Sequence, residues 1–102
     1  MNLEIGMYVR TINGKIWVIT SQKAISGHRK DIINASYNII DLIEVGDYVN
    51  GYKVYYCYCA DEDSTGLFID TEKGREWLDK SNQIKSIVTR EMFESMEYKV
   101  KE

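Results

Sequence analysis

The side chains that could carry out nucleophilic or metal chemistry are few and far apart in this chain. Cys57 and Cys59 are its two cysteines, and His28 is its single histidine. Nucleophilic catalysis needs a nucleophile, a base and a group that orients the base, and a structural zinc ion usually takes four nitrogen or sulfur ligands. We therefore expect two structural thiols and a loop histidine. The sequence predicts no catalytic residue, no metal site and no cofactor, and so a protein that is not an enzyme.

An acidic segment over residues 61–72 has part of the spacing of a calcium-binding loop. Asp61, Asp63 and Glu72 take positions one, three and twelve of such a loop. A helix should precede it, whereas the preceding residues alternate like a strand, and Ile69 at position nine cannot ligate through its side chain. A solvated hairpin turn is the preferred interpretation, with calcium binding as the alternative.

Tyrosine dominates the segment before this turn, residues 52–59, which is the most strand-like in the chain. One face is expected to carry Tyr52, Val54, Tyr56 and Tyr58. The other face is expected to carry Lys53, Tyr55, Cys57 and Cys59. Three interpretations stay open: a core strand, a protein-recognition face, or a platform on which bases of a single-stranded nucleic acid stack.

A protein-recognition surface is the functional interpretation that these residues favour. Tyrosine gives a large rigid contact area with a polar tip, and the acidic turn lies directly beside it in the sequence. The candidate protein-binding residues are Tyr55, Tyr58, Asp61, Glu62 and Asp63.

Composition and charge restrict the class of protein. The chain has 102 residues and a net charge of -3, which predicts a single globular domain over residues 1–102. A nucleic-acid binder would show a basic face, so the charge disfavours nucleic acid as a partner. No apolar run approaches the ~20 residues of a membrane helix, and no basic region followed by an apolar run opens the chain. We therefore expect that the protein does not associate with a membrane and that it is located in a reducing cytoplasm.

Two glycine-led segments begin alike and organise the predicted fold. Glu4-Ile5-Gly6 aligns with Glu44-Val45-Gly46, and Tyr8-Val9 aligns with Tyr48-Val49. Each is followed by an Asn-Gly pair, at residues 13–14 and 50–51, which is a strong hairpin signal. The pattern predicts two β-units, over residues 1–41 and 42–102, as an internal pseudo-repeat.

The remaining segments complete a mainly β prediction. Residues 21–30 are expected to form a loop, 31–35 a strand, and 36–42 a short helical turn capped by Ser36. Residues 67–69 and 84–88 are expected to be strands, residues 71–81 are either a turn or a short helix, and Thr89 caps a helix over residues 90–96. The predicted fold is a small SH3-like barrel or sandwich of six to eight short antiparallel strands with a short C-terminal helix.

Two strings support a family resemblance. NIIDLIEVGDYVNGYKV at residues 38–54 and IKSIVTREMFESMEYKV at residues 84–100 resemble short uncharacterised proteins of phages and prophages of Gram-positive bacteria. The opening IGMYVRT with GKI after it fits the same pattern. The resemblance implies a phage origin and a shared scaffold, and it brings no catalytic residue.

These observations lead to three functional hypotheses. The first is a phage-encoded binding protein in the host cytoplasm that inhibits a bacterial defence protein, with anti-CRISPR activity against a Cas effector as the first expectation. The second is a protein that sequesters a nucleotide signal or another small ligand between two β-units, as a homo-oligomer, in a pocket lined by Arg10, Lys53, Arg75 or tryptophan. The third is a structural component of a virion or its assembly.

Overall fold

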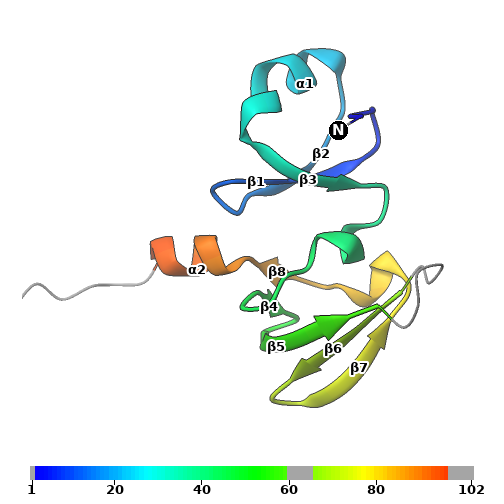
Figure 1. The fold of residues 1–102 in the computed structure, drawn as a ribbon, viewed down its shortest axis with the longest axis vertical. Coiled ribbons are helices and arrows are strands. Elements are labelled where there is room, and N and C mark those ends of the chain that lie inside the picture. The colour runs from blue at the N-terminus through cyan, green and yellow to red at the C-terminus, as the bar shows by residue number, and fades with distance from the viewer. Residues whose placement is uncertain (1, 60–65, 97–102) are drawn as a thin grey trace, which may run out of the picture.

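The computed structural model describes residues 2–59 and 66–96, and these residues form two antiparallel sheets (Figure 1). The first sheet has the order β2-β1-β3, with β1 at Tyr8–Thr11, β2 at Ile16–Val18 and β3 at Ile32–Ser36. The second has the order β7-β6-β5-β4-β8. Its strands are β4 (Tyr48–Val49), β5 (Tyr52–Tyr58), β6 (Leu67–Thr71), β7 (Gly74–Leu78) and β8 (Ile87–Val88). The mainly β prediction is confirmed, and the strands of the described residues do not close into a barrel.

Short helices connect the strands, and one of them corrects a prediction. Residues 21–30 were expected to be a loop, whereas α1 spans Gln22–His28 and a 3-10 turn, η1, follows at Arg29–Asp31. The Ser21 side chain accepts a hydrogen bond from the Ala24 N–H, 3.2 Å away, and so caps the helix. Ile25 is buried against the first sheet, and this tertiary contact stabilises a helix that is short and polar by itself.

The other helical segments follow the predicted pattern more closely. The turn η2 at Ile39–Leu42 is capped by Asn38, whose side chain accepts a hydrogen bond from the Ile40 N–H, so the predicted cap at Ser36 is two residues early. The turn η3 at Ser81–Gln83 was not predicted, and the strand expected over residues 84–88 is limited to β8 at Ile87–Val88. The C-terminal helix α2 spans Arg90–Met96, and the Thr89 hydroxyl accepts the Met92 N–H at 3.3 Å, which confirms Thr89 as its cap. No helix among the described residues is long and apolar enough to cross a membrane.

The two glycine-led segments form the same backbone turn. Gly6 and Gly46 have φ angles of 98° and 95°, which a residue with a Cβ atom rarely adopts. The N–H of Gly6 donates to the Ile19 carbonyl at 2.8 Å, and that of Gly46 donates to the Val54 carbonyl at 2.9 Å. Each glycine therefore ties a turn to the return strand of its own hairpin. The predicted repeat of whole β-units stays a prediction.

The two Asn-Gly pairs make different hairpin turns. Asn50 and Gly51 both have positive φ, 53° and 88°, and Val49 pairs with Tyr52 across them, as expected for a two-residue turn. At the first pair only Gly14 has a positive φ, 82°. The Gly14 N–H donates to the Thr11 carbonyl at 2.9 Å, so this hairpin has a longer loop than the sequence predicts.

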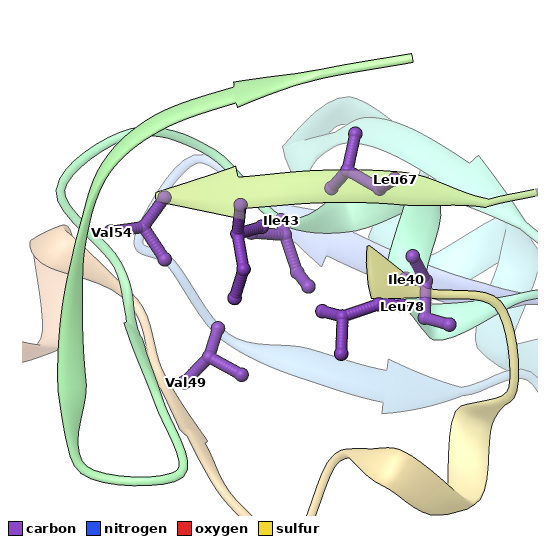
Figure 2. Close-up of a cluster of buried hydrophobic side chains, with 7 residues drawn as sticks. Ile40, Ile43, Val49, Val54, Leu67 and Leu78 are labelled. Atoms are coloured by element: carbon purple, nitrogen blue, oxygen red, sulfur yellow. The ribbon is translucent and has the colours of Figure 1, made fainter. Parts of the chain in front are cut away.

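Each sheet has its own small hydrophobic core. The first is formed by Val9, Ile19, Ile25 and Ile32. The second, drawn in Figure 2, gathers side chains from η2, from the residue that follows it and from β4 to β7. Its members are Ile40, Ile43, Val49, Val54, Leu67, Ile69 and Leu78. In Figure 1 the three-stranded sheet and α1 form the upper part of the molecule, and the five-stranded sheet forms the lower part.

A β-bulge in β5 makes the predicted alternation of residues 52–59 wrong beyond Val54. Val54 pairs with Thr71 and Tyr56 pairs with Asp70, so Tyr55 is an extra residue on this strand. Tyr55 and Tyr56 are 55% and 56% exposed, and Cys57 packs against the second core.

Residues 74–78 belong to the segment for which a turn and a short helix were both left open. They form neither of these but the strand β7.

Candidate functional site

The structure divides the candidate binding residues into two groups. Tyr55 projects at the bulge, and Tyr58 lies near the end of β5, beside Phe68 of β6. Asp61, Glu62 and Asp63 lie outside the described residues. The same holds for residues 61–65 of the segment whose spacing resembles a calcium-binding loop. Their part in the site stays a prediction.

The outer face of strands β5, β6 and β7 carries four aromatic rings in contact, which we call the aromatic column. Its members are Tyr56, Tyr58, Phe68 and Trp77. Tyr58 is paired with Phe68, and Phe68 with Trp77, so the strand register places the three side chains on one face. Their ring centroids lie 5.3 Å and 4.6 Å apart, and those of Tyr56 and Tyr58 lie 5.4 Å apart. The sequence pattern did not reveal this column, because it depends on the register of three strands and on the bulge.

An ion pair lies next to the aromatic column on the same face. Asp70 is paired with Arg75 across strands, and Arg75 Nε donates to Asp70 Oδ1 at 3.0 Å. The Arg75 guanidinium lies 5.6 Å from the ring centroid of Tyr58, within the range of a cation–π contact. The hydrogen bond to Asp70 and the charge of that carboxylate raise the pKa of Arg75. The face thus combines apolar area with one fixed cation and one fixed anion.

The geometry of the rings decides what the column can contact. Tyr58 and Phe68 are stacked with an interplanar angle of 26°, so one face of each ring is turned toward the other ring. A single-strand platform also needs cations for the phosphate backbone, and Arg75 beside the column is already paired with Asp70, which disfavours that interpretation. Ring edges and the exposed Tyr55 and Tyr56 remain for contacts with protein side chains.

Gly66 allows Trp77 to lie close to the backbone of the hairpin. A Cβ atom at Gly66 would come within 2.2 Å of the Trp77 ring. A side chain at this position would push the indole off the sheet, and the column would lose its last ring. The column consequently depends on a glycine that the sequence reading assigned only to a turn.

The thiol and imidazole groups lie in different parts of the fold. Cys57 packs against the second core, and burial raises the pKa of its thiol, helped by the charges of Asp47 and Glu44. A raised pKa favours the protonated thiol, which is a weak nucleophile. The His28 ring lies 5.4 Å from Trp17, beside the first core. Among residues 2–59 and 66–96, no three His, Cys, Asp or Glu side chains gather as a metal site would require.

An apolar groove of about 340 Å³ lies between the β1–β2 hairpin and the segment formed by β8 and α2. Its lining includes Ile16, Trp17, Ile39, Ile87 and Met92. Of the side chains expected in a ligand pocket, Trp17 is present, whereas Arg10, Lys53 and Arg75 are absent from its walls. The groove therefore lacks the cations that would bind the phosphates of a nucleotide.

Arg10 is instead the centre of a buried charge cluster, which we call the Arg10 clasp. Its guanidinium makes two hydrogen bonds to the Asp47 carboxylate, at 2.5 Å and 2.9 Å, and a third to the Leu42 carbonyl at 2.9 Å. Its Nη2 also donates to Glu91 Oε2 at 2.8 Å, and its Nε lies 3.1 Å from Glu44 Oε2 in an ion pair without hydrogen-bond geometry. Arg10 and Asp47 are fully buried. The clasp joins β1 to the turn before β4 and to α2.

The electrostatics of the clasp favour its charged form. Burial alone would lower the pKa of Arg10, but the hydrogen bond to Asp47 and the three carboxylate charges outweigh it and raise the pKa. Burial alone would raise the pKa of Glu91, whereas a backbone hydrogen bond and the charges of Arg10 and Arg90 lower it. Sequence reasoning considered Arg10 only as a ligand-binding residue. The one local signal for its burial is its place between Val9 and Thr11 in a short buried strand.

The comparisons with known proteins assign no family to this chain. The resemblance of residues 38–54 and 84–100 to phage and prophage proteins stays a prediction. No protein-family model, no curated protein and no solved structure matches this chain.

Proposed function

We propose that this protein is a non-catalytic binding protein that contacts a partner protein through the aromatic column and the neighbouring Tyr55. The observation that carries the proposal is the exposure of two adjacent tyrosines, 55% and 56%, beside a continuous strip of packed aromatic rings. Tyrosine and tryptophan are enriched among the residues that dominate binding energy at protein interfaces. The Arg75–Asp70 pair would give the contact its orientation.

The nature of the partner follows from the sequence resemblance. A phage or prophage origin supports a bacterial defence protein in the host cytoplasm as the target, with a Cas effector as the first candidate, and inhibition as the result. The acidic residues Asp61, Glu62 and Asp63 would extend the contact surface from Tyr58. The glycine-led strand starts support an SH3-like relationship between the two sheets.

A second candidate function rests on the groove. Its size is at the lower end of small-molecule sites, and its lining is mainly apolar. Sequestering of a hydrophobic molecule fits this lining better than sequestering of a nucleotide. A structural role in a virion has no supporting feature among the described residues.

The experiment uses tagged protein to capture its partner from a lysate of a Gram-positive host, followed by calorimetry with the purified partner. The double variant Tyr55→Ser/Tyr56→Ser removes two exposed rings and leaves both cores intact. We expect its dissociation constant to rise at least about 10-fold, since interface anchors cost more than 1 kcal/mol when truncated.

The matched control is Ile33→Ser, which removes an exposed apolar side chain from β3 in the other sheet. Its dissociation constant should equal that of the parent protein. Equal affinity of the tyrosine variant and the parent would reject the aromatic column as the contact surface.

A further inference from the structure

The described chain packs as two units that share no core residue. The N-terminal unit, residues 2–36, contains β1, β2, α1 and β3, and the C-terminal unit, residues 39–96, contains η2 and all later elements. The core residues of the first unit lie between Val9 and Ile32, and those of the second between Ile40 and Leu78. The turn η2 lies between the two cores: its Leu42 is fully buried but belongs to neither of them, and the turn packs against β1 and β3.

The joint between the units contains a charge cluster, the turn η2 and an open groove. The Arg10 clasp supplies its charged contacts, and the Thr89 hydroxyl donates a hydrogen bond to the Gly14 carbonyl at 2.7 Å. The turn η2 also packs against β1 and β3, and the Ser36 hydroxyl donates to the Asp41 carboxylate at 2.5 Å. Beside them lies the apolar groove of about 340 Å³, where the two units face each other without filling the space. Polar interfaces between packed units favour relative motion.

We propose that the Arg10 clasp is an acid-releasable joint, and that protonation of its carboxylates detaches and unfolds the N-terminal unit while the five-stranded sheet stays folded. The unit has a core of four fully apolar buried residues. Units below about 40 residues rarely fold alone without a metal, a disulfide or a partner surface. Once detached, the three-stranded sheet therefore loses its order.

The charges explain why acid acts on this joint. Arg10 of β1 faces Glu44 and Asp47, from the turn before β4, and Glu91 of α2. Arg90 of α2 also pairs with Glu44 and Glu91. Two guanidinium groups thus face three carboxylates. Protonating the carboxylates leaves the fully buried Arg10 cation without compensation, which is strongly unfavourable.

Asp47 makes release of α2 part of the same event. Its Oδ2 accepts the Glu44 N–H at 2.8 Å, and its Oδ1 accepts the Arg90 N–H at 3.0 Å at the start of the helix. A neutral Asp47 would weaken both the turn and the helix start. The surface on which the β1–β2 hairpin rests would then lose its fixed position.

The sign of the pH effect follows from Glu91. Its pKa in the folded protein is lowered by Arg10 and Arg90 despite burial. A lowered pKa stabilises the joint fully above the unfolded pKa of about 4.3, and this stabilisation is lost as the pH falls through the lower folded pKa. Release is therefore expected below about pH 4.

The test uses the two tryptophans, one in each unit. Trp77→Phe leaves Trp17 as the reporter of the N-terminal unit, and Trp17→Phe leaves Trp77 as the reporter of the C-terminal unit. Fluorescence is followed during acid titration. We expect the Trp17 signal to change at a pH at least about 0.5 units above that of the Trp77 signal.

A matched pair of substitutions connects the effect to the clasp. Glu91→Gln removes one clasp carboxylate and should move the Trp17 transition to higher pH without moving the Trp77 transition. Glu72→Gln removes an exposed carboxylate from the β6–β7 turn and should move neither. Because the His28 ring lies 5.4 Å from the Trp17 ring and would affect its fluorescence, both variants are measured in a His28→Gln background.

A second measurement needs no tryptophan substitution. Backbone amide resonances of the unaltered chain are followed by NMR during the same titration. The amide signals of β1, β2 and β3 should lose their chemical-shift dispersion at a pH where the signals of β5, β6 and β7 keep their native chemical shifts. Coincident transitions in the two units, by fluorescence or by NMR, would overturn the proposal.

Discussion

At the scale of the residue, Arg10 has the greatest structural effect. A buried guanidinium is stable only when its donors meet acceptors and its charge is balanced. Asp47, Glu91 and the Leu42 carbonyl satisfy these requirements from three segments distant in sequence. One side chain therefore links the first sheet to η2, to the turn before β4 and to α2.

The contribution of the buried ion pair to stability can be tested by replacing its carboxylate with an amide. The same replacement in an exposed ion pair serves as the comparison. Asp47→Asn removes the charge that faces fully buried Arg10, so we expect the free energy of unfolding in urea to fall by about 3 kcal/mol. Asp70→Asn breaks a similar pair, but the Arg75 side chain is 61% exposed, so the expected loss is much smaller than for Asp47→Asn. Equal losses in the two variants would contradict the assignment of Asp47 as the main stabilising partner.

At the scale of the element, the hairpins show how one residue type serves two purposes. Gly14 and Gly51 both have φ near +85°, at 82° and 88°, and both follow an asparagine. A Cβ at Gly51 would meet nothing within 4 Å, whereas one at Gly14 would lie 2.2 Å from Thr89 Oγ1 and 2.7 Å from Glu91 Cβ. The first hairpin thus needs glycine for its turn and also for its contact with α2.

Alanine substitution separates these two requirements. Gly51→Ala should lower the free energy of unfolding by about 1 kcal/mol, since only the left-handed backbone conformation is strained. Gly14→Ala carries the same strain and also a steric clash, so the expected loss is about 3 kcal/mol or more. Thermal and urea denaturation of both variants would show the difference, and a smaller loss for Gly14→Ala would show that α2 does not rest on this turn.

At the scale of the whole molecule, stability should depend on pH through the joint between the units. Glu91 stabilises the folded chain only while it is ionised, because its pKa is lowered on folding. The Glu91→Gln variant should be less stable than the parent at neutral pH. The difference should shrink as the pH falls below the unfolded pKa of about 4.3 and through the lower folded pKa, where the parent side chain also becomes neutral.

Urea denaturation at several pH values measures this difference directly. The exposed Glu72→Gln variant serves as the control, and its difference from the parent should stay near zero across the range. A difference for Glu91→Gln that stays constant with pH would mean that its side chain acts through packing and not through charge.

Several features could be read from the sequence because they are local. Positive φ at Asn50-Gly51 and at the two strand-starting glycines depends on the steric freedom of those residues alone. The cap at Thr89 likewise requires only a hydroxyl before a helix with an apolar stripe. The helix α1 was missed although Ser21 is a cap, because its polar segment acquires helical order only when Ile25 packs on the sheet.

The aromatic column and its neighbours depended on pairing between strands. The bulge at Tyr55 shifts every later residue of β5 to the opposite face, and no local signal marks its place. The alternation predicted that Tyr55 and Tyr58 lie on opposite faces of the strand. In the structure it is the two adjacent residues Tyr55 and Tyr56 that are exposed. Register is a property of two strands together, so alternation within one strand could not reveal it.

The sequence by itself determined the mainly β class, the turn positions and the C-terminal helix, since backbone sterics and side-chain periodicity act over a few residues. Only the tertiary structure decided that the two sheets remain separate, that Arg10 joins them, and which aromatic rings share a face. These features arise from contacts between distant segments. Their energies depend on burial and charge compensation, which exist only once the chain has folded.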